Sequence, residues 1–264
     1  MSVATPVELL RSWLGPLGRY RPGLLRKDMA EGFRNCDALA TPRWARFRRS
    51  MSAEERLLLQ LNLRRKVAYD IGAHTGAYAL FFSRRVGAGG RVIAFEPQPD
   101  NFATLTRNLE ANAIRNVLPL RLALGNQRGR RTIFMLPGMP TTASLADDAR
   151  TPLRRQAGET QVERLDELVA AAALPCPDFI KIDVEGMELD VLCGAEQTLA
   201  RSRPQILVEI HGCGRRQKAE RMRAVATLLL GLGYQLCHVE SGRAITGHPG
   251  RLAAGHVFAS AGSR

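Results

Sequence analysis

Short apolar runs alternate along the chain with longer segments in which apolar residues recur at every third or fourth position. The first clear unit lies within residues 66–97. There, an apolar run at 67–71 is followed by a glycine turn, a helical pattern through Val86 and a second apolar run at 92–95. A strand, a helix and a further strand of these lengths are typical of neighbouring parallel strands. The pattern therefore predicts a βαβ unit.

The same alternation continues towards the C-terminus. The pattern predicts strands at 117–124, 132–136, 178–184, 205–210, 234–239 and 256–260, and helices at 101–112, 165–173, 187–199 and 217–231. Strands that alternate with helices usually form a mainly parallel sheet with helices on both faces. The predicted fold class is therefore α/β.

Residues 1–64 precede this pattern and are interpreted as a basic helical extension, which leaves 65–264 as the main domain. Ser52 with Glu55 three residues later is a capping box, so a helix is expected to start there. Arginines between positions 43 and 49 surround two aromatic rings. Such a cluster could bind RNA or an anionic membrane surface. We favour the commoner arrangement, in which arginines cover rings that pack on the main domain.

A segment rich in turn-forming residues, 137–144, follows the strand predicted at 132–136. It is too long for an ordinary connection, and loops of this kind usually have a function. We interpret it as a flap over the substrate, and an insertion without function is the alternative.

The chain has 264 residues, of which 45% are hydrophobic, and a net charge of +13. These values allow one large α/β domain with an extension. Nearly all the basic residues are arginines, a bias that coding composition explains as readily as nucleic-acid binding. A nucleic-acid partner is therefore not expected.

The five cysteines are widely spaced and form no C-x-x-C pair, which is typical of reduced thiols in a cytoplasmic protein. Glycines and prolines interrupt the first 27 residues, and no cleavage site for a signal peptide follows them. No apolar run approaches the roughly 18 residues that a membrane span requires.

An acidic glycine turn, Asp70-Ile71-Gly72-Ala73-His74-Thr75-Gly76, ends the first predicted strand. Gly72 and Gly76 remove side chains where a ligand must approach the backbone. A phosphate favours a turn without a carboxylate, and Asp70 would repel it. Glu96 ends the next strand, where a carboxylate can accept hydrogen bonds from both ribose hydroxyls. A cationic nucleoside, S-adenosylmethionine, therefore fits this turn, and a plain structural turn is the alternative.

Four polar side chains follow two of the predicted strands, at the edge where open α/β sheets bind ligands: Asp183, Glu185, Glu209 and His211. If the methyl acceptor is a hydroxyl, its proton must be removed by a general base, or its pKa must be lowered by a metal. His211 is the first candidate for the base because imidazole titrates near neutral pH, and Glu185 is the second. Carboxylates at 183, 185 and 209 also offer oxygen ligands for Mg²⁺, a cofactor that the sequence allows.

The alternative for His211 is a strand-end histidine that bonds only to the backbone. Glu188 is expected to lie in solvent or in a salt bridge on its helix. The remaining histidines, His238, His248 and His256, have no companion residues at ligand spacing, and no role is predicted for them.

Several segments carry a recognisable set of motifs within about residues 66–212: DIGAHTG, FEPQPDNFATLTRN, LALGN, VERLDEL, FIKIDVEGMELDVLCGAE and ILVEIHG. They resemble the FkbM family of S-adenosylmethionine-dependent methyltransferases. The resemblance implies a Rossmann-like class I methyltransferase fold with seven strands in the order 3-2-1-4-5-7-6 and an antiparallel last strand. It also implies O-methylation of a hydroxyl on a small molecule such as a sugar, glycolipid, polyketide or other secondary metabolite.

The resemblance further implies which residues bind the cofactor. The loop around the methionine moiety would comprise Asp70, Gly72, Ala73, His74, Thr75 and Gly76. Glu96 would bind the ribose, Ala123 and Leu124 would lie beside the adenine, and Asp183 would face the methyl donor. Methyltransferases in general have glycine where this chain has His74, a departure that the FkbM pattern tolerates.

Two functions from other classes stay open beside a small-molecule O-methyltransferase. The positive charge and the arginine cluster at 43–49 favour an RNA methyltransferase, although the chain has no N-P-P-Y-type motif and no recognisable RNA-binding module. The second open function is that of a nicotinamide-dependent oxidoreductase or a cofactor-binding regulatory protein, since a fold alone does not fix function.

Overall fold

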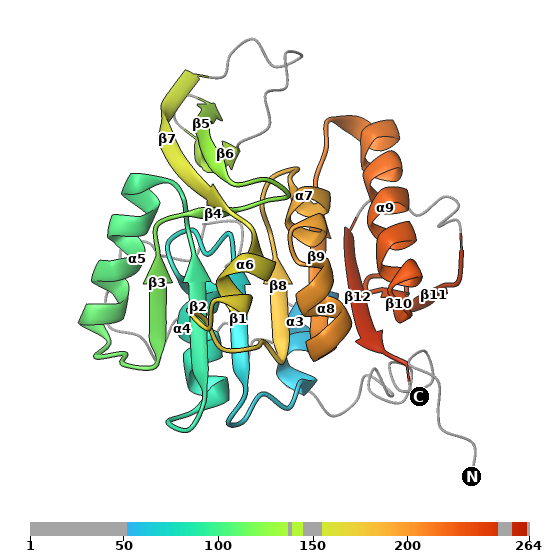
Figure 1. The fold of residues 1–264 in the computed structure, drawn as a ribbon, viewed down its shortest axis with the longest axis horizontal. Helices are drawn as coiled ribbons and strands as arrows, with labels where there is room; N and C mark the ends of the chain where they lie inside the picture. Colours follow the sequence, from blue (N-terminus) through green and yellow to red (C-terminus); the bar gives the residue numbers. More distant parts are fainter. Residues whose placement is uncertain (1–51, 137–138, 145–154, 248–254, 263–264) are drawn as a thin grey trace.

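The computed structural model describes residues 52–136, 139–144, 155–247 and 255–262. It contains an eight-stranded sheet with helices on both faces and a smaller sheet of four strands (Figure 1). The predicted α/β class and the class I methyltransferase architecture are confirmed.

The large sheet has the strand order β11-β10-β12-β9-β8-β1-β2-β3. Its strands are β1 (Val67–Ile71), β2 (Arg91–Phe95), β3 (Val117–Leu120), β8 (Phe179–Ile182), β9 (Gln205–Ile210), β10 (Tyr234–His238), β11 (Arg243–Ile245) and β12 (Gly255–Ala261). Strand β12 is antiparallel to both neighbours, β9 and β10. This is the expected order 3-2-1-4-5-7-6 with an antiparallel last strand, and β11 extends the sheet beyond β10.

Two layers of helices cover the large sheet. One layer comprises α6 (Leu165–Ala170), α7 (Glu188–Cys193), α8 (Glu196–Ser202) and α9 (Gly214–Gly231), and the other α3 (Ala53–Gln60), α4 (Ala77–Val86) and α5 (Pro99–Ala111). Because side chains alternate along a strand, Tyr69 and Ile71 pack under the first layer and Ala68 under the second. None of the helices in the described ranges is both long and apolar enough to cross a bilayer.

Helix α3 starts with the predicted capping box. The Ser52 hydroxyl accepts a hydrogen bond from the N–H of Glu55, and the Glu55 carboxylate accepts one from the N–H of Ser52. Leu57 and Leu58 are buried in the same apolar cluster as the α4 side chains Phe81 and Phe82. The domain boundary at residue 64 stays a prediction, and the arginine cluster at 43–49 lies outside the described residues.

The strand predicted at 117–124 is divided between the two sheets. Strand β3 ends at Leu120, and Pro119 within it lacks the N–H that an inner strand would donate, which suits its edge position. The following β4 (Ala123–Leu124) instead pairs in parallel with β7 (Arg155–Glu163) of the small sheet. The prediction of one continuous strand was therefore wrong, because an apolar run does not reveal which sheet it joins.

The small sheet also contains β5 (Gly129–Leu136) and β6 (Met139–Ser144), an antiparallel pair. The irregular flap predicted at 137–144 is therefore a strand from 139 to 144, where threonines favour extended backbone. Residues 145–154 lie outside the described ranges. Figure 1 shows the small sheet beyond the edge at which the parallel strands of the large sheet end.

The helix predicted at 187–199 is two helices, α7 and α8, which are interrupted at Gly194. A Cβ atom at Gly194 would overlap the carbonyl oxygen of Gly125, so the backbone approaches the small sheet closely here. The Gly194 carbonyl accepts a hydrogen bond from the N–H of Asp166 at 3.0 Å. A contact of this kind cannot be read from helical periodicity.

Candidate active site

A cavity of about 480 Å³ lies at the carboxyl ends of β1, β2, β8 and β9. Pockets of a few hundred Å³ are of the usual size for small-molecule sites. The predicted site residues that line it are Gly72, Ala73, His74, Thr75, Glu96, Ala123, Leu124, Asp183, Glu185, Glu209 and His211. Asp70 and Gly76 are not among the lining residues.

The glycine turn brings three strand ends together. Gly72 and Gly76 have φ angles of 87° and 91°, which only glycine adopts readily. A Cβ atom at Gly72 would overlap the carbonyl oxygen of Asp183, and the Gly72 N–H donates to the Phe95 carbonyl at 2.9 Å. His74 has a φ of 51°, a left-handed conformation that is unusual for a residue with a side chain. The turn is therefore fixed against the neighbouring strands.

Glu96 follows β2 and is held by the backbone of two loops. One carboxylate oxygen accepts a hydrogen bond from the N–H of His74 at 2.7 Å, and the other accepts one from the N–H of Gln98 at 2.9 Å. Burial raises the pKa of Glu96, and these hydrogen bonds oppose the rise. Because each carboxylate oxygen has a further lone pair, Glu96 can still accept hydrogen bonds from a ligand in the cavity.

Asp70 lies beneath the glycine turn, opposite Lys181 in the pairing of β1 with β8. It is fully buried, and burial raises its pKa to about 7. The buried Lys181 ammonium contacts the Asp183 carboxylate at 2.8 Å and the Tyr78 ring at 4.2 Å from its centroid. Asp70 therefore contributes to the charge balance below the cavity and does not form part of its wall.

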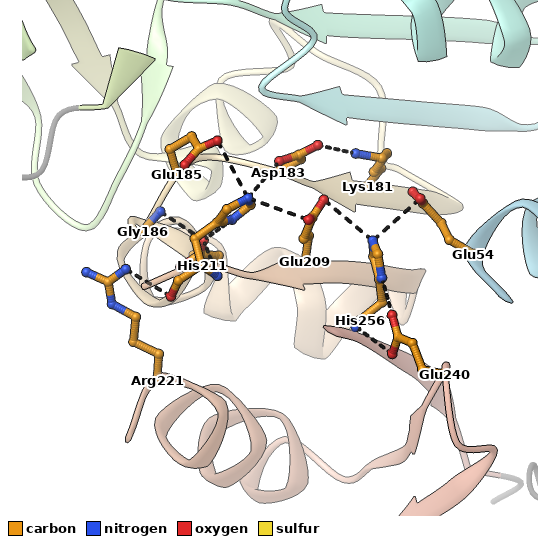
Figure 2. A network of polar contacts seen from close by, with 11 residues as sticks. Glu54, Lys181, Asp183, Glu185, Gly186, Glu209, His211, Arg221, Glu240 and His256 are labelled. Atoms are coloured by element: carbon orange, nitrogen blue, oxygen red, sulfur yellow. Dashed lines mark hydrogen bonds and ion pairs between the residues drawn. The ribbon is translucent and has the colours of Figure 1, made fainter. Parts of the chain in front are cut away.

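His211 lies among four carboxylates just beyond β9 (Figure 2). Its Nδ1 is 2.8 Å from Glu188, while its Nε2 is 3.5 Å from Asp183, 3.7 Å from Glu185 and 3.7 Å from Glu209. Burial lowers the pKa of His211, but the hydrogen bond to Glu188 and the other carboxylates outweigh burial and raise the pKa to about 9. The ring is therefore mostly cationic at neutral pH.

Glu188 is buried and paired with His211 at 2.8 Å, so of the two expected environments, solvent or a salt bridge, the structure shows the salt bridge. Its carboxylate accepts hydrogen bonds from the Gly186 N–H at 2.9 Å and the His211 N–H at 3.4 Å, besides the contact with the His211 ring. A carboxylate on Nδ1 fixes the ring orientation and directs Nε2 into the cavity. A glutamate three residues after Glu185, in the first turn of a helix beside the site, was the available signal for this role.

His256 belongs to a second histidine–carboxylate cluster, although no role was predicted for it. Its Nδ1 is 2.6 Å from Glu240, and its Nε2 is 3.5 Å from both Glu54 and Glu209. Burial lowers the pKa of His256, and the three carboxylates together raise it to about 10. No sequence spacing reveals this cluster, because its members come from α3, β9, β12 and the turn after β10.

The other two histidines stay without a role. His238 hydrogen bonds to Ser241 at 2.8 Å and lies 3.3 Å from Glu240, and it does not line the cavity. His248 lies outside the described residues.

Asp183, Glu209 and His211 present ligand atoms within 4.8 Å of one another, a grouping compact enough to test for a metal. The donors do not fit Mg²⁺ well, because that ion prefers oxygen ligands and one donor here is an imidazole nitrogen. Asp183 already contacts the Lys181 ammonium, and Glu209 already faces the cationic His256. The carboxylates therefore have cationic partners from the chain itself, and Glu185 faces His211 in the same way.

Comparison with known proteins places the chain in a family. Residues 70–236 match the model of the methyltransferase FkbM domain. Hexuronic acid methyltransferase AglP of Haloferax volcanii is 30% identical over 219 residues, which cover 80% of this chain and 84% of AglP. The 31-O-demethyl-FK506 methyltransferase FkbM of Streptomyces tacrolimicus is 29% identical over 174 residues, which cover 55% of this chain and 65% of that protein.

A solved structure, methyltransferase FkbM of Methylobacillus flagellatus, is 20% identical with a TM-score of 0.47, covering 75% of this chain and 45% of that one. The family match spans more than half of the chain and includes the glycine turn, Glu96, Asp183 and His211. The chain therefore belongs to the FkbM family and is an S-adenosylmethionine-dependent methyltransferase.

Proposed function

We propose that the chain transfers a methyl group from S-adenosylmethionine to a hydroxyl of a small polyhydroxylated molecule, with His211 as the general base. The observation that carries the proposal is the orientation of His211. A buried carboxylate, Glu188, holds Nδ1, and Nε2 points to the carboxyl ends of the parallel strands. This is the position at which an acceptor can meet a ligand bound along the glycine turn.

In this proposal the residues that line the cavity from β4 to β9 would hold the cofactor. Ala123 and Leu124 would contact the adenine, Glu96 would accept hydrogen bonds from the ribose hydroxyls, and the loop from Gly72 to Gly76 would surround the methionine moiety. Support comes from the shared cavity that these residues line, apart from Gly76, and from the fixed carboxylate of Glu96. Asp183 lies between the ribose end and His211, where its negative charge favours a sulfonium.

The bound cofactor supplies an activated methyl group, which forms a bond to the acceptor oxygen as its bond to sulfur breaks. The protein aligns the acceptor and removes the hydroxyl proton, which the neutral His211 accepts at Nε2. Glu188 stabilises the resulting imidazolium. Glu185 is the second candidate for the base, since it lines the same cavity and burial raises its pKa.

The names of the relatives support a small molecule as the acceptor. AglP is named for a hexuronic acid, and the Streptomyces relative is named for 31-O-demethyl-FK506. RNA methylation rests on the positive charge and on the arginine cluster at 43–49, which lies outside the described residues. Family membership argues against an oxidoreductase. A cytoplasmic location, which the number and spacing of the cysteines favour, and the helical extension at 1–64 both stay predictions.

The test is a panel of neutral hexoses, amino sugars, uronic acids, inositols and a structured RNA, each incubated with the full chain and labelled S-adenosylmethionine. We expect label in at least one polyol and none in the RNA, and no effect of EDTA on turnover. Calorimetry with S-adenosylhomocysteine and with NAD runs in parallel. Binding of NAD without binding of the adenosyl ligand would overturn the proposal.

The pH dependence of turnover follows from the raised pKa of His211. Only the neutral ring accepts a proton, so kcat/KM is expected to rise about tenfold per pH unit below the pKa and to level off above it. The apparent pKa should be about 9, or somewhat lower once the positive charge of the cofactor opposes the imidazolium. The affinity for S-adenosylhomocysteine over the same pH range is the control. A flat profile between about pH 6 and pH 9 would assign the base to Glu185.

A further inference from the structure

Glu209 in the active site lies between two histidines (Figure 2). One of its carboxylate oxygens is 3.7 Å from Nε2 of His211, and the other is 3.5 Å from Nε2 of His256. Glu209 lines the cavity and is 36% exposed, whereas the His256 side chain is only 12% exposed. The carboxylate thus connects the cavity to a histidine that the proposed reaction does not use.

The pairing of β12 with β9 places the two side chains together. His256 is directly opposite Glu209 in the antiparallel register. Directly opposite side chains on neighbouring strands lie on the same face of a sheet within contact distance, and opposite charges there stabilise each other. The contact therefore follows from the backbone and does not depend on a long, mobile side chain.

The His256 ring is fixed from its other side. Glu240 contacts Nδ1 at 2.6 Å and accepts hydrogen bonds from the His256 backbone N–H at 3.0 Å. Glu54 of α3 approaches Nε2 to 3.5 Å. With carboxylates at both nitrogens, the ring can neither rotate nor lose its proton easily, so Glu209 faces a fixed cation.

The family match covers residues 70–236, and Glu54, Glu240 and His256 all lie outside it. We propose that His256, fixed by Glu54 and Glu240, is a positioning residue that holds the Glu209 carboxylate against His211 in the active site. The inference rests on the proposed function. It makes α3 and β12 parts of the catalytic arrangement, although neither lies within the matched domain.

The position of Glu209 predicts which step depends on it. Glu209 lies beside His211 at the end of β9, and β8 and β1 separate β9 from β2, the strand that Glu96 follows. Releasing the Glu209 carboxylate should therefore disturb the base and the acceptor, and leave the adenosyl ligand in place. The expected signature of a His256 variant is a lower kcat with unchanged affinity for S-adenosylhomocysteine.

The test compares His256→Gln with His238→Gln in the full chain. His238 is the matched control because it also contacts Glu240 but contacts neither Glu209 nor the cavity. With the best acceptor of the panel, we expect His256→Gln to lower kcat by about tenfold or more and His238→Gln to change it by less than about twofold. An equal loss in both variants would indicate a general effect of disturbing Glu240 and would overturn the proposal.

A double-mutant cycle asks whether His256 acts through Glu209. If it does, the double variant His256→Gln/Glu209→Gln should have about the same kcat as Glu209→Gln alone. Losses that multiply in the double variant would mean that the two residues act separately, and the proposal would fail. Glu54→Gln, on a different element, provides the same comparison should His256→Gln not fold.

A measurement without any acceptor separates this inference from the proposed function. Carbon-13 NMR of the glutamate carboxyl groups reports the pKa of Glu209, which should rise in His256→Gln and stay constant in His238→Gln. An unchanged Glu209 pKa in His256→Gln would show that the pair does not interact. If the pKa rises but no acceptor is methylated, the contact stands and the proposed function fails.

Discussion

Replacing His211 with alanine is expected to lower kcat by about a hundredfold or more, because the hydroxyl proton then has no general base. The affinity for S-adenosylhomocysteine should change by less than about twofold, since His211 lies at the acceptor end of the cavity. Calorimetry measures the affinity, and transfer of labelled methyl groups measures kcat. Together they separate a chemical defect from a binding defect.

The matched control is His238→Ala, which removes a largely buried histidine from β10 without touching the cavity. It should leave both kcat and the affinity for S-adenosylhomocysteine near their original values. If His211→Ala retained full turnover, Glu185 would become the general base, and the pH profile of Glu185→Gln would be the next measurement. A loss of adenosyl affinity in His211→Ala would instead move His211 to the cofactor half of the site.

Replacing Glu96 with alanine is expected to weaken binding of S-adenosylhomocysteine by about ten- to a hundredfold. This is the loss of a charge-assisted hydrogen bond worth about 1.5–3 kcal/mol. The carboxylate is already oriented by the backbone N–H groups of His74 and Gln98, so the ligand does not have to order it. Glu96→Gln should have a smaller effect, because the amide keeps one acceptor oxygen.

Part of the effect of Glu96→Ala will come from the two backbone N–H groups that lose their acceptor. Circular dichroism and the melting temperature of each variant show whether the glycine turn survives. The control is Glu110→Ala on the exposed side of α5, which should leave the affinity unchanged. An unchanged affinity in a folded Glu96→Ala would remove Glu96 from the ribose site.

The sequence predicts well those parts of the fold whose conformation depends on residues close to one another in the chain. The turn between β1 and α4 needs two glycines, Gly72 and Gly76, and the apolar runs at 67–71 and 92–95 form β1 and β2 as expected. The same reasoning located the strand ends that carry Asp183, Glu185, Glu209 and His211, because parallel strands deliver their ends to one edge. The cavity brings these residues together with Glu96.

The features that the sequence does not predict depend on contacts between distant segments. Glu188 resembles an exposed helix residue, yet it is buried because the helix packs against the end of β9. His256 pairs with Glu209 only through the register of two antiparallel strands. Asp70 was expected to face the ligand, and strand alternation instead directs it towards Lys181. Apolar periodicity has no information on any of these three contacts.

Helix α3 lies before the family domain, yet its leucines fill the core and its Glu54 reaches His256. Both the packing of the core and the position of His256 therefore depend on this short helix. A variant without α3 would expose the aromatic side chains of α4 to solvent. It would also lose the contact of Glu54 with His256, beside the acceptor end of the active site. Homologues that contain α3 should therefore also contain β12, and substitutions of Glu54 should occur together with substitutions on β12.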